Sequence, residues 1–71
     1  MQIEIYKTNV QEVREADLLL RKLLEHFPKY KINFDLSDCD KILRVEADLV
    51  VNEKIISVVI HSGFECELIL D

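Results

Sequence analysis

The chain has 71 residues, with 14 acidic and 9 basic side chains and a net charge of −5. This length allows one domain with a thin core, and it leaves little room for the deep cleft that most enzymes use. The negative charge disfavours binding to nucleic-acid phosphates and to anionic membranes. No apolar run approaches the roughly 18 residues of a membrane span, and the chain begins with the strand-like run MQIEIYK. We therefore expect neither a signal peptide nor a membrane segment.

Two cysteines, Cys39 and Cys66, allow at most one disulfide bond. Cys39 lies in a predicted turn and Cys66 in a predicted strand, and the chain has no cysteine-dense framework. These features favour a reduced protein of the cytoplasm.

Residues 2–7 (QIEIYK) alternate between apolar and polar side chains, which is typical of a strand with one buried face. This pattern predicts that Ile3 and Ile5 face the core. The side chains of Glu4 and Tyr6 are then expected on the open face.

A helix is predicted after this strand. Asn9 is a suitable N-cap because Glu12 lies three residues later, as in a capping box. The helix should end by Phe27, because Pro28 cannot continue its hydrogen bonds. The apolar residues that recur at helical spacing, and that we expect in the core, are Val13, Ala16, Leu20, Leu23, Leu24 and Phe27.

Two further alternating runs, residues 30–36 (YKINFDL) and 41–47 (KILRVEA), flank the turn-forming segment 37–40, which predicts a β-hairpin. Their inward-facing residues should be Tyr30, Ile32, Phe34, Leu36, Leu43, Val45 and Ala47.

The last third of the chain predicts a second helix and a final strand. Asp48 or Asn52 should cap the helix, which runs to about Ser62, and Gly63 suits the left-handed position that follows a helix. The residues of this region that we expect in the core are Ile55, Val58, Val59, Phe64, Cys66, Leu68 and Leu70.

The six elements form the order βαββαβ in a single domain that spans residues 1–71. Right-handed crossovers then predict a ferredoxin-like α+β sandwich, in which two helices cover one face of a four-stranded antiparallel sheet. The loop after the first strand, the hairpin and the turn before the last strand should lie at the same end of the sheet.

The closing segment SGFEC (residues 62–66), preceded by Ile55, Val58 and Val59, resembles the end of heavy-metal-associated domains, the copper-chaperone-like family. The first helix and the YKINFDL strand also match that family's pattern. The resemblance covers nearly the whole chain and implies the ferredoxin-like fold.

The metal motif of that family, Met-x-Cys-x-x-Cys at the end of the first strand, is absent. The corresponding segment reads KTNVQEVREA, so either Val10 and Val13 or Val13 and Ala16 stand at the cysteine positions. Valine and alanine offer no lone pair to a soft Cu(I) ion. The sequence therefore predicts a cysteine-less relative with no cofactor and no tight Cu(I) site.

A different metal site is an alternative. Cys39 lies between Asp38 and Asp40, and His61 lies at the end of the second helix, so all four should be at one end of the sheet. Such a set would suit Zn²⁺. The two aspartates are also ordinary turn formers, and a histidine is favourable at a helix C-terminus without any metal.

The open face of the sheet is a second place to search for function. RNA-recognition domains with this topology stack bases on two or three aromatic residues of that face. Here only Tyr6 is expected there, among several carboxylates, so we predict no RNA binding.

Leu18, Ile56 and Ile60 fall outside the predicted core stripes of the helices and are the candidate interaction residues. A contiguous patch of such residues would mark an interface. The sequence thus predicts a non-enzymatic interaction or regulatory module with a protein partner or a homodimeric state. The alternatives are a metal-handling protein that uses Cys39 and His61, and a small-molecule-sensing dimer with its ligand near Thr8-Asn9.

Overall fold

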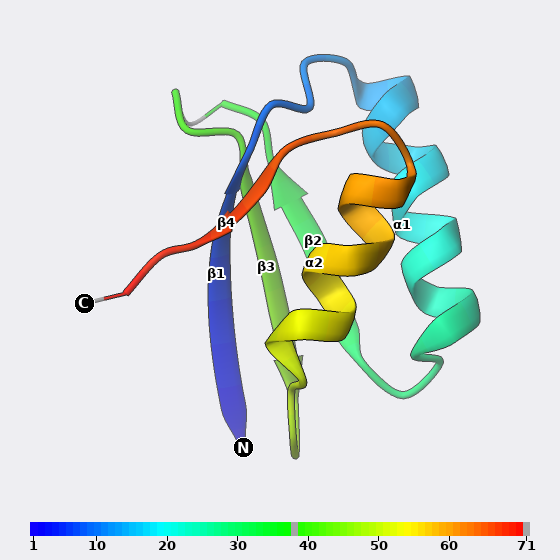
Figure 1. The fold of residues 1–71 in the computed structure, drawn as a ribbon, viewed down its shortest axis with the longest axis vertical. Coiled ribbons are helices and arrows are strands. Elements are labelled where there is room, and N and C mark those ends of the chain that lie inside the picture. The colour runs from blue at the N-terminus through cyan, green and yellow to red at the C-terminus, as the bar shows by residue number, and fades with distance from the viewer. Residues whose placement is uncertain (38, 71) are drawn as a thin grey trace.

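The computed structural model describes residues 1–37 and 39–70, and it contains the six expected elements in the expected order (Figure 1). Their bounds are β1 Gln2–Thr8, α1 Val13–His26, β2 Lys31–Asp35, β3 Ile42–Ala47, α2 Asn52–His61 and β4 Cys66–Leu68. Within the described residues, neither helix is long and apolar enough to cross a membrane. Asp38, which belongs to the predicted Asp38–Asp40 turn, lies outside the described residues.

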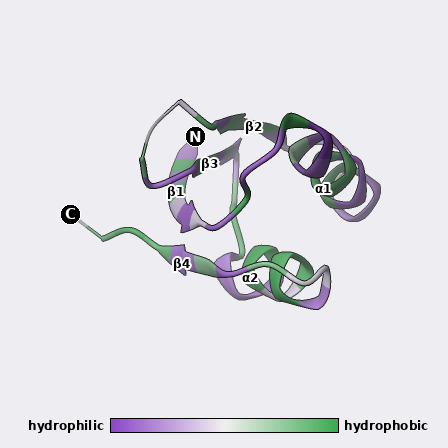
Figure 2. Cartoon of the chain, turned by 90° about the horizontal axis from the view of Figure 1, so that it is seen from above, coloured by the Kyte–Doolittle hydropathy of each residue, from purple (hydrophilic) through white to green (hydrophobic). Residues whose placement is uncertain are grey.

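The four strands form one antiparallel sheet in the order β2-β3-β1-β4, which reads β4-β1-β3-β2 from the other edge. Both helices lie on the same side of this sheet (Figures 1 and 2). Helix α1 packs against β2 and helix α2 packs against β4, and the two helices also contact each other. The expected α+β architecture is therefore present, and β2 and β4 are its two edge strands.

The core lies between the sheet and the helices. In β3 and α2 it is formed by the residues that the sequence predicts: Leu43, Val45, Ile55 and Val59 are fully buried. The predicted inward residues Ile32 and Phe34 of the edge strand β2 are half-buried and pack against this core. Alternation therefore predicted the inner faces of the hairpin strands correctly.

The prediction for β1 was wrong by one residue. Tyr6 and Thr8 face the helices and are buried, whereas Ile3 is 46% exposed on the open face. The register explains this orientation, because Tyr6 is paired with Leu43 of β3, and directly opposed residues share a face. The inward polar groups have partners: the Tyr6 hydroxyl donates to Asn52 Oδ1, and the Gln2 side chain bonds to the backbone of Val50.

Helix α1 is also rotated relative to the prediction. Its buried residues are Ala16, Leu19 and Leu23, whereas Val13 is 69% exposed. The helix begins after Glu12 and not after Asn9, and Glu15 Oε1 accepts the Glu12 N–H at 3.2 Å. The predicted stripe included Val13 and omitted Leu19, and this helix carries more apolar residues than the sheet can cover.

The end of α2 forms the predicted glycine cap. Gly63 has a φ of 96°, which side chains with a Cβ rarely adopt. The Phe64 N–H donates to the Val59 carbonyl at 3.2 Å, and the Gly63 N–H donates to the Ile60 carbonyl at 3.0 Å. These two bonds define a Schellman motif, which turns the chain toward β4. Strand β4 ends at Leu68, so the expected inward position of Leu70 was wrong: this residue is exposed.

Candidate interaction surface

The end of the sheet that carries the β1–α1 loop is held together by its own polar side chains. Thr8 Oγ1 donates to the Lys41 carbonyl at 2.6 Å and accepts the Val10 N–H at 3.3 Å. Asn9 Oδ1 accepts the Glu65 N–H at 2.8 Å. Both polar residues of the Thr8-Asn9 segment, where a small ligand was one alternative, thus connect the loop to its neighbours.

The two valines at this loop have opposite environments. Val10 is fully buried, whereas Val13 lies at the exposed start of α1. Burial of Val10 joins the loop to the core, and neither side chain provides a metal ligand.

Cys39 and His61 have separate surroundings. Cys39 is exposed in the hairpin between β2 and β3. His61 lines a cavity of ≈ 440 Å³ between the two helices, together with Glu25 and His26 of α1. Its Nδ1 donates to the Ser57 carbonyl at 2.8 Å. Among the described residues, no group of three or more His, Cys, Asp or Glu side chains is placed to hold a metal ion.

The two thiols should react at very different rates. Cys39 is exposed, whereas burial raises the pKa of Cys66 to about 12. At pH 8 only about one in ten thousand Cys66 thiols is then ionised, and the thiolate is the reactive form. We expect one rapid equivalent with an aromatic disulfide reagent in the native protein and two in denaturant. The Cys39→Ser variant should lose the rapid equivalent, and a second rapid equivalent in the native wild type would contradict the burial of Cys66.

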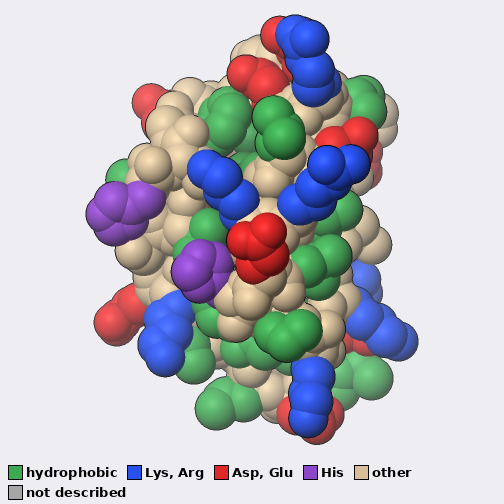
Figure 3. All heavy atoms as spheres, turned by 90° about the vertical axis from the view of Figure 1, so that its right-hand side faces the viewer, with side chains coloured by type: hydrophobic (Ala, Val, Ile, Leu, Met, Phe, Trp, Pro, Cys, Tyr) green, Lys and Arg blue, Asp and Glu red, His purple; other side chains and the backbone are tan. Residues whose placement is uncertain are grey.

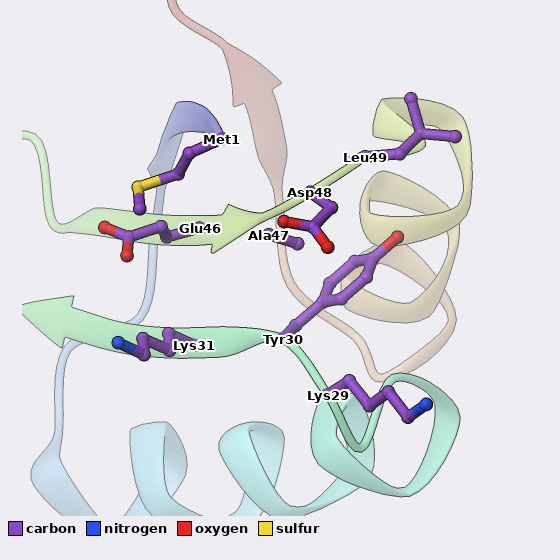
Figure 4. Close-up of a pocket in the computed structure, with 8 residues that line it drawn as sticks. All are labelled: Met1, Lys29, Tyr30, Lys31, Glu46, Ala47, Asp48 and Leu49. Carbon is purple, nitrogen blue, oxygen red and sulfur yellow. The ribbon is translucent and has the colours of Figure 1, made fainter.

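An open hollow of ≈ 470 Å³ lies at the other end of the sheet (Figure 4). It is bordered by Met1 at the start of β1, Tyr30 and Lys31 at the start of β2, and residues 46–49 at the end of β3. Lys31 is the cross-strand neighbour of Glu46, so charges of both signs border the space. The hollow thus combines a mixed-charge rim with one aromatic ring.

The candidate residues Leu18, Ile56 and Ile60 do not lie in one groove. Leu18 is exposed and lines a cavity with Lys22 of α1 and Phe64 of the α2–β4 connection. Ser57, Val58 and His61 are the α2 residues that line the cavity beside α1, and helical spacing places Ile56 and Ile60 on the opposite flank. Ile60 is exposed there, whereas Ile56 is half-buried and packs against the core, which corrects its expected position outside it. On the helix-bearing side of the molecule, hydrophobic side chains are interspersed with charged ones and histidine (Figure 3).

A more continuous apolar surface lies where α1 meets the edge strand β2. Here a groove of ≈ 350 Å³ is lined by apolar side chains from both elements, with Asp17 and Asn33 as its polar members. Helical spacing continues the surface from Leu20 to Leu24, which is 37% exposed. We call this surface the α1–β2 flank and define it by Val13, Leu20, Leu24, Phe34 and Leu36.

The sequence predicted all five residues of the α1–β2 flank as core residues. Phe34 and Leu36 do pack against the core, whereas Val13 and Leu24 are exposed. The signal that could have identified the flank is the width of the apolar stripe of α1. Ala16, Leu19 and Leu23 are the buried residues of α1 that contact the core, so Val13 and Leu24 are apolar residues that the core does not cover. An apolar surplus at one flank of a helix is a candidate interface where its residues form a contiguous patch.

The open face of the sheet carries isoleucines among charges. Ile3 and Ile69 are exposed there, and the Ile69 N–H donates to the Ile5 carbonyl at 2.9 Å. Arg44 is opposite Ile5, and its Nη2 lies 3.2 Å from Glu46 Oε1. Because Tyr6 is buried on the helix side, it is not available for base stacking, which corrects its expected position.

No protein-family model matches this chain, and the comparisons with curated proteins and with solved structures found no match either.

Proposed function

We propose that this chain is a non-enzymatic protein-interaction module with a ferredoxin-like arrangement, related to heavy-metal-associated domains by its core pattern and not by a metal site. The βαββαβ order and the strand order β4-β1-β3-β2 support the arrangement. The Schellman motif at Gly63 and Phe64 supports the family pattern. Both described cysteines are free, which supports a reducing compartment such as the cytoplasm.

The observation that carries the interaction function is the α1–β2 flank. Val13 is 69% exposed and lines the groove beside β2, and Leu24, one turn after the groove residue Leu20, is 37% exposed. Complete burial of an exposed side chain of this size contributes about 1.5–3 kcal/mol. The flank residues gain this in proportion to their exposed fractions, so Val13 contributes most. A partner that covers α1 and β2 together gains both apolar contacts and backbone hydrogen bonds along the strand edge.

Site-specific photo-crosslinking in cells that naturally produce the chain tests this function. We expect a benzophenone side chain at position 24, on the α1–β2 flank, to form a discrete covalent adduct. The matched control is the same side chain at position 18, which lies on α1 but lines a different cavity. It should give little or no adduct, because the proposed partner covers only the β2 side of the helix.

Three results of this experiment separate the possibilities. Adducts at position 24 and not at 18 support an interaction through the α1–β2 flank, and their mass reports whether the partner is a second copy. Equal adducts at both positions would indicate non-specific contacts. The absence of adducts at both positions would overturn the proposed function.

A further inference from the structure

We propose that the partner at the α1–β2 flank is a second copy of this chain, and that β2 of each copy pairs antiparallel about a two-fold axis through Asn33. This inference rests on the proposed interaction function and names its partner. Within the described residues, β2 is an edge strand whose neighbour in the sheet is β3 alone. Such an edge can accept a further strand, because every second residue directs its backbone N–H and C=O away from the sheet.

The charges of β2 are self-complementary in this one register. Lys31, Asn33 and Asp35 alternate with Ile32 and Phe34, and the first three are exposed. When two antiparallel strands are centred on Asn33, Lys31 of each copy lies opposite Asp35 of the other. The same register places Ile32 opposite Phe34 on the helix side. Moving the centre by one residue, to Ile32 or Phe34, separates Lys31 from Asp35 and leaves no Lys–Asp pair within β2.

The other edge of the sheet lacks this complementarity. Strand β4 has only three residues, and the exposed side chains along and just before it are Glu67 and Glu65. An antiparallel pair of β4 strands would place carboxylates near one another, which is unfavourable. Self-association through the sheet is therefore directed to β2.

Pairing at β2 would also cover the apolar residues of α1. Because opposed residues in the proposed register share a face, both α1 helices lie on the same side of the joined sheet. The groove places Leu20 beside Asn33 and Phe34, so the two-fold axis passes close to the middle of α1. Val13 and Leu24 lie toward opposite ends of this helix, so each approaches the other in the second copy. The interface is isologous, as in most small homodimers.

Charge exchange in the purified full chain tests both the partner and the register. In a dimer of the Lys31→Glu variant, the new carboxylate at position 31 faces Asp35 of the other copy at both ends of the strand pair. In a dimer of the Asp35→Lys variant, the new ammonium group at position 35 faces Lys31 of the other copy. We expect each variant alone to dimerise roughly tenfold more weakly than wild type in sedimentation experiments, because two cross-strand ion pairs become two repulsions. An equimolar mixture should recover wild-type affinity, since both cross-strand pairs of the heterodimer are again of opposite sign.

The mixture also distinguishes a loss of affinity that comes from charge repulsion in the proposed register from one that comes from a misfolded variant. Asp35 Oδ1 accepts the Ser37 N–H at 3.2 Å, so Asp35→Lys can disturb the hairpin, but mixing would not repair a damaged hairpin. Leu24→Lys should weaken the dimer at least tenfold and Leu18→Lys should not, with circular dichroism confirming that both are folded.

Each outcome decides one of the two proposals. A wild type that remains monomeric, with a position-24 crosslink to a different protein, overturns the homodimer and preserves the interaction function. A dimer that Leu24→Lys weakens but whose charge variants are not rescued by mixing overturns the β2 register. A dimer unaffected by Leu24→Lys places the contact elsewhere and overturns the inference.

Discussion

The Val10→Asp variant is expected to be unfolded, whereas Val13→Asp should remain folded with nearly the stability of the wild type. Val10 is fully buried between the loop and the core, and an unpaired carboxylate there costs several kcal/mol. Total stabilities of about 5–15 kcal/mol make such a loss decisive for a small domain. Val13 is 69% exposed in the first turn of α1, where a carboxylate interacts favourably with the helix dipole.

Thermal unfolding monitored by circular dichroism measures this contrast. Dilute protein should be used, because Val13 belongs to the α1–β2 flank and a charge there also weakens association. A Val13→Asp protein that unfolds, beside a stable Val10→Asp protein, would show that the loop and the start of α1 are placed incorrectly.

The position of α1 along the chain was predictable, but its rotation about its own axis was not. Pro28 limits the helix, and apolar residues recur through it. Its leucines occupy both flanks as well as the centre of the core stripe, so a 3.6-residue period fits several rotations. The contact of α1 with β2 and α2 selects the rotation that buries Leu19 and Leu23.

Strands β3 and β1 differ in whether apolar–polar alternation predicts the buried face. In β3, Leu43 and Val45 alternate with Arg44 and Glu46, and the structure follows this alternation. In β1 the two isoleucines suggested one face, but the buried face contains Tyr6. Its hydroxyl has a partner 46 residues away in Asn52, and such a long-range bond is invisible to local alternation.

The sequence predicted that the residues of the α1–β2 flank are apolar, but it did not predict that they lie on the surface. Leu20 and Leu24 were recognised as apolar helix residues, but their role depends on which strand forms the edge beside α1. The sheet order decides that β2 is this edge and β4 the other. Similarly, Leu18 and Ile60 were recognised as surplus residues, and only the packing of α1 against α2 shows that they lie in different places.

Replacing Tyr6 by alanine should destabilise the domain by about 3–5 kcal/mol, the range for removing a large buried aromatic side chain. Tyr6 is fully buried, and burial together with the nearby Glu4 raises the pKa of its phenol, so the neutral hydroxyl is the form that donates to Asn52. Tyr6→Phe keeps the ring but leaves Asn52 Oδ1 without this donor, and it should cost about 1–2 kcal/mol. The control is Ile3→Ala, which truncates a residue that is 46% exposed on the opposite face and should cost about 1 kcal/mol or less.

Urea unfolding at one protein concentration gives the three free energies of unfolding. The order of losses should be Tyr6→Ala, then Tyr6→Phe, then Ile3→Ala, because burial and the hydrogen bond both belong to the face that carries Tyr6. If Ile3→Ala were the most damaging of the three, β1 would face the helices with its isoleucines, as its alternation suggests. The register with β3 would then shift by one residue, and Leu43 would lose Tyr6 as its cross-strand neighbour.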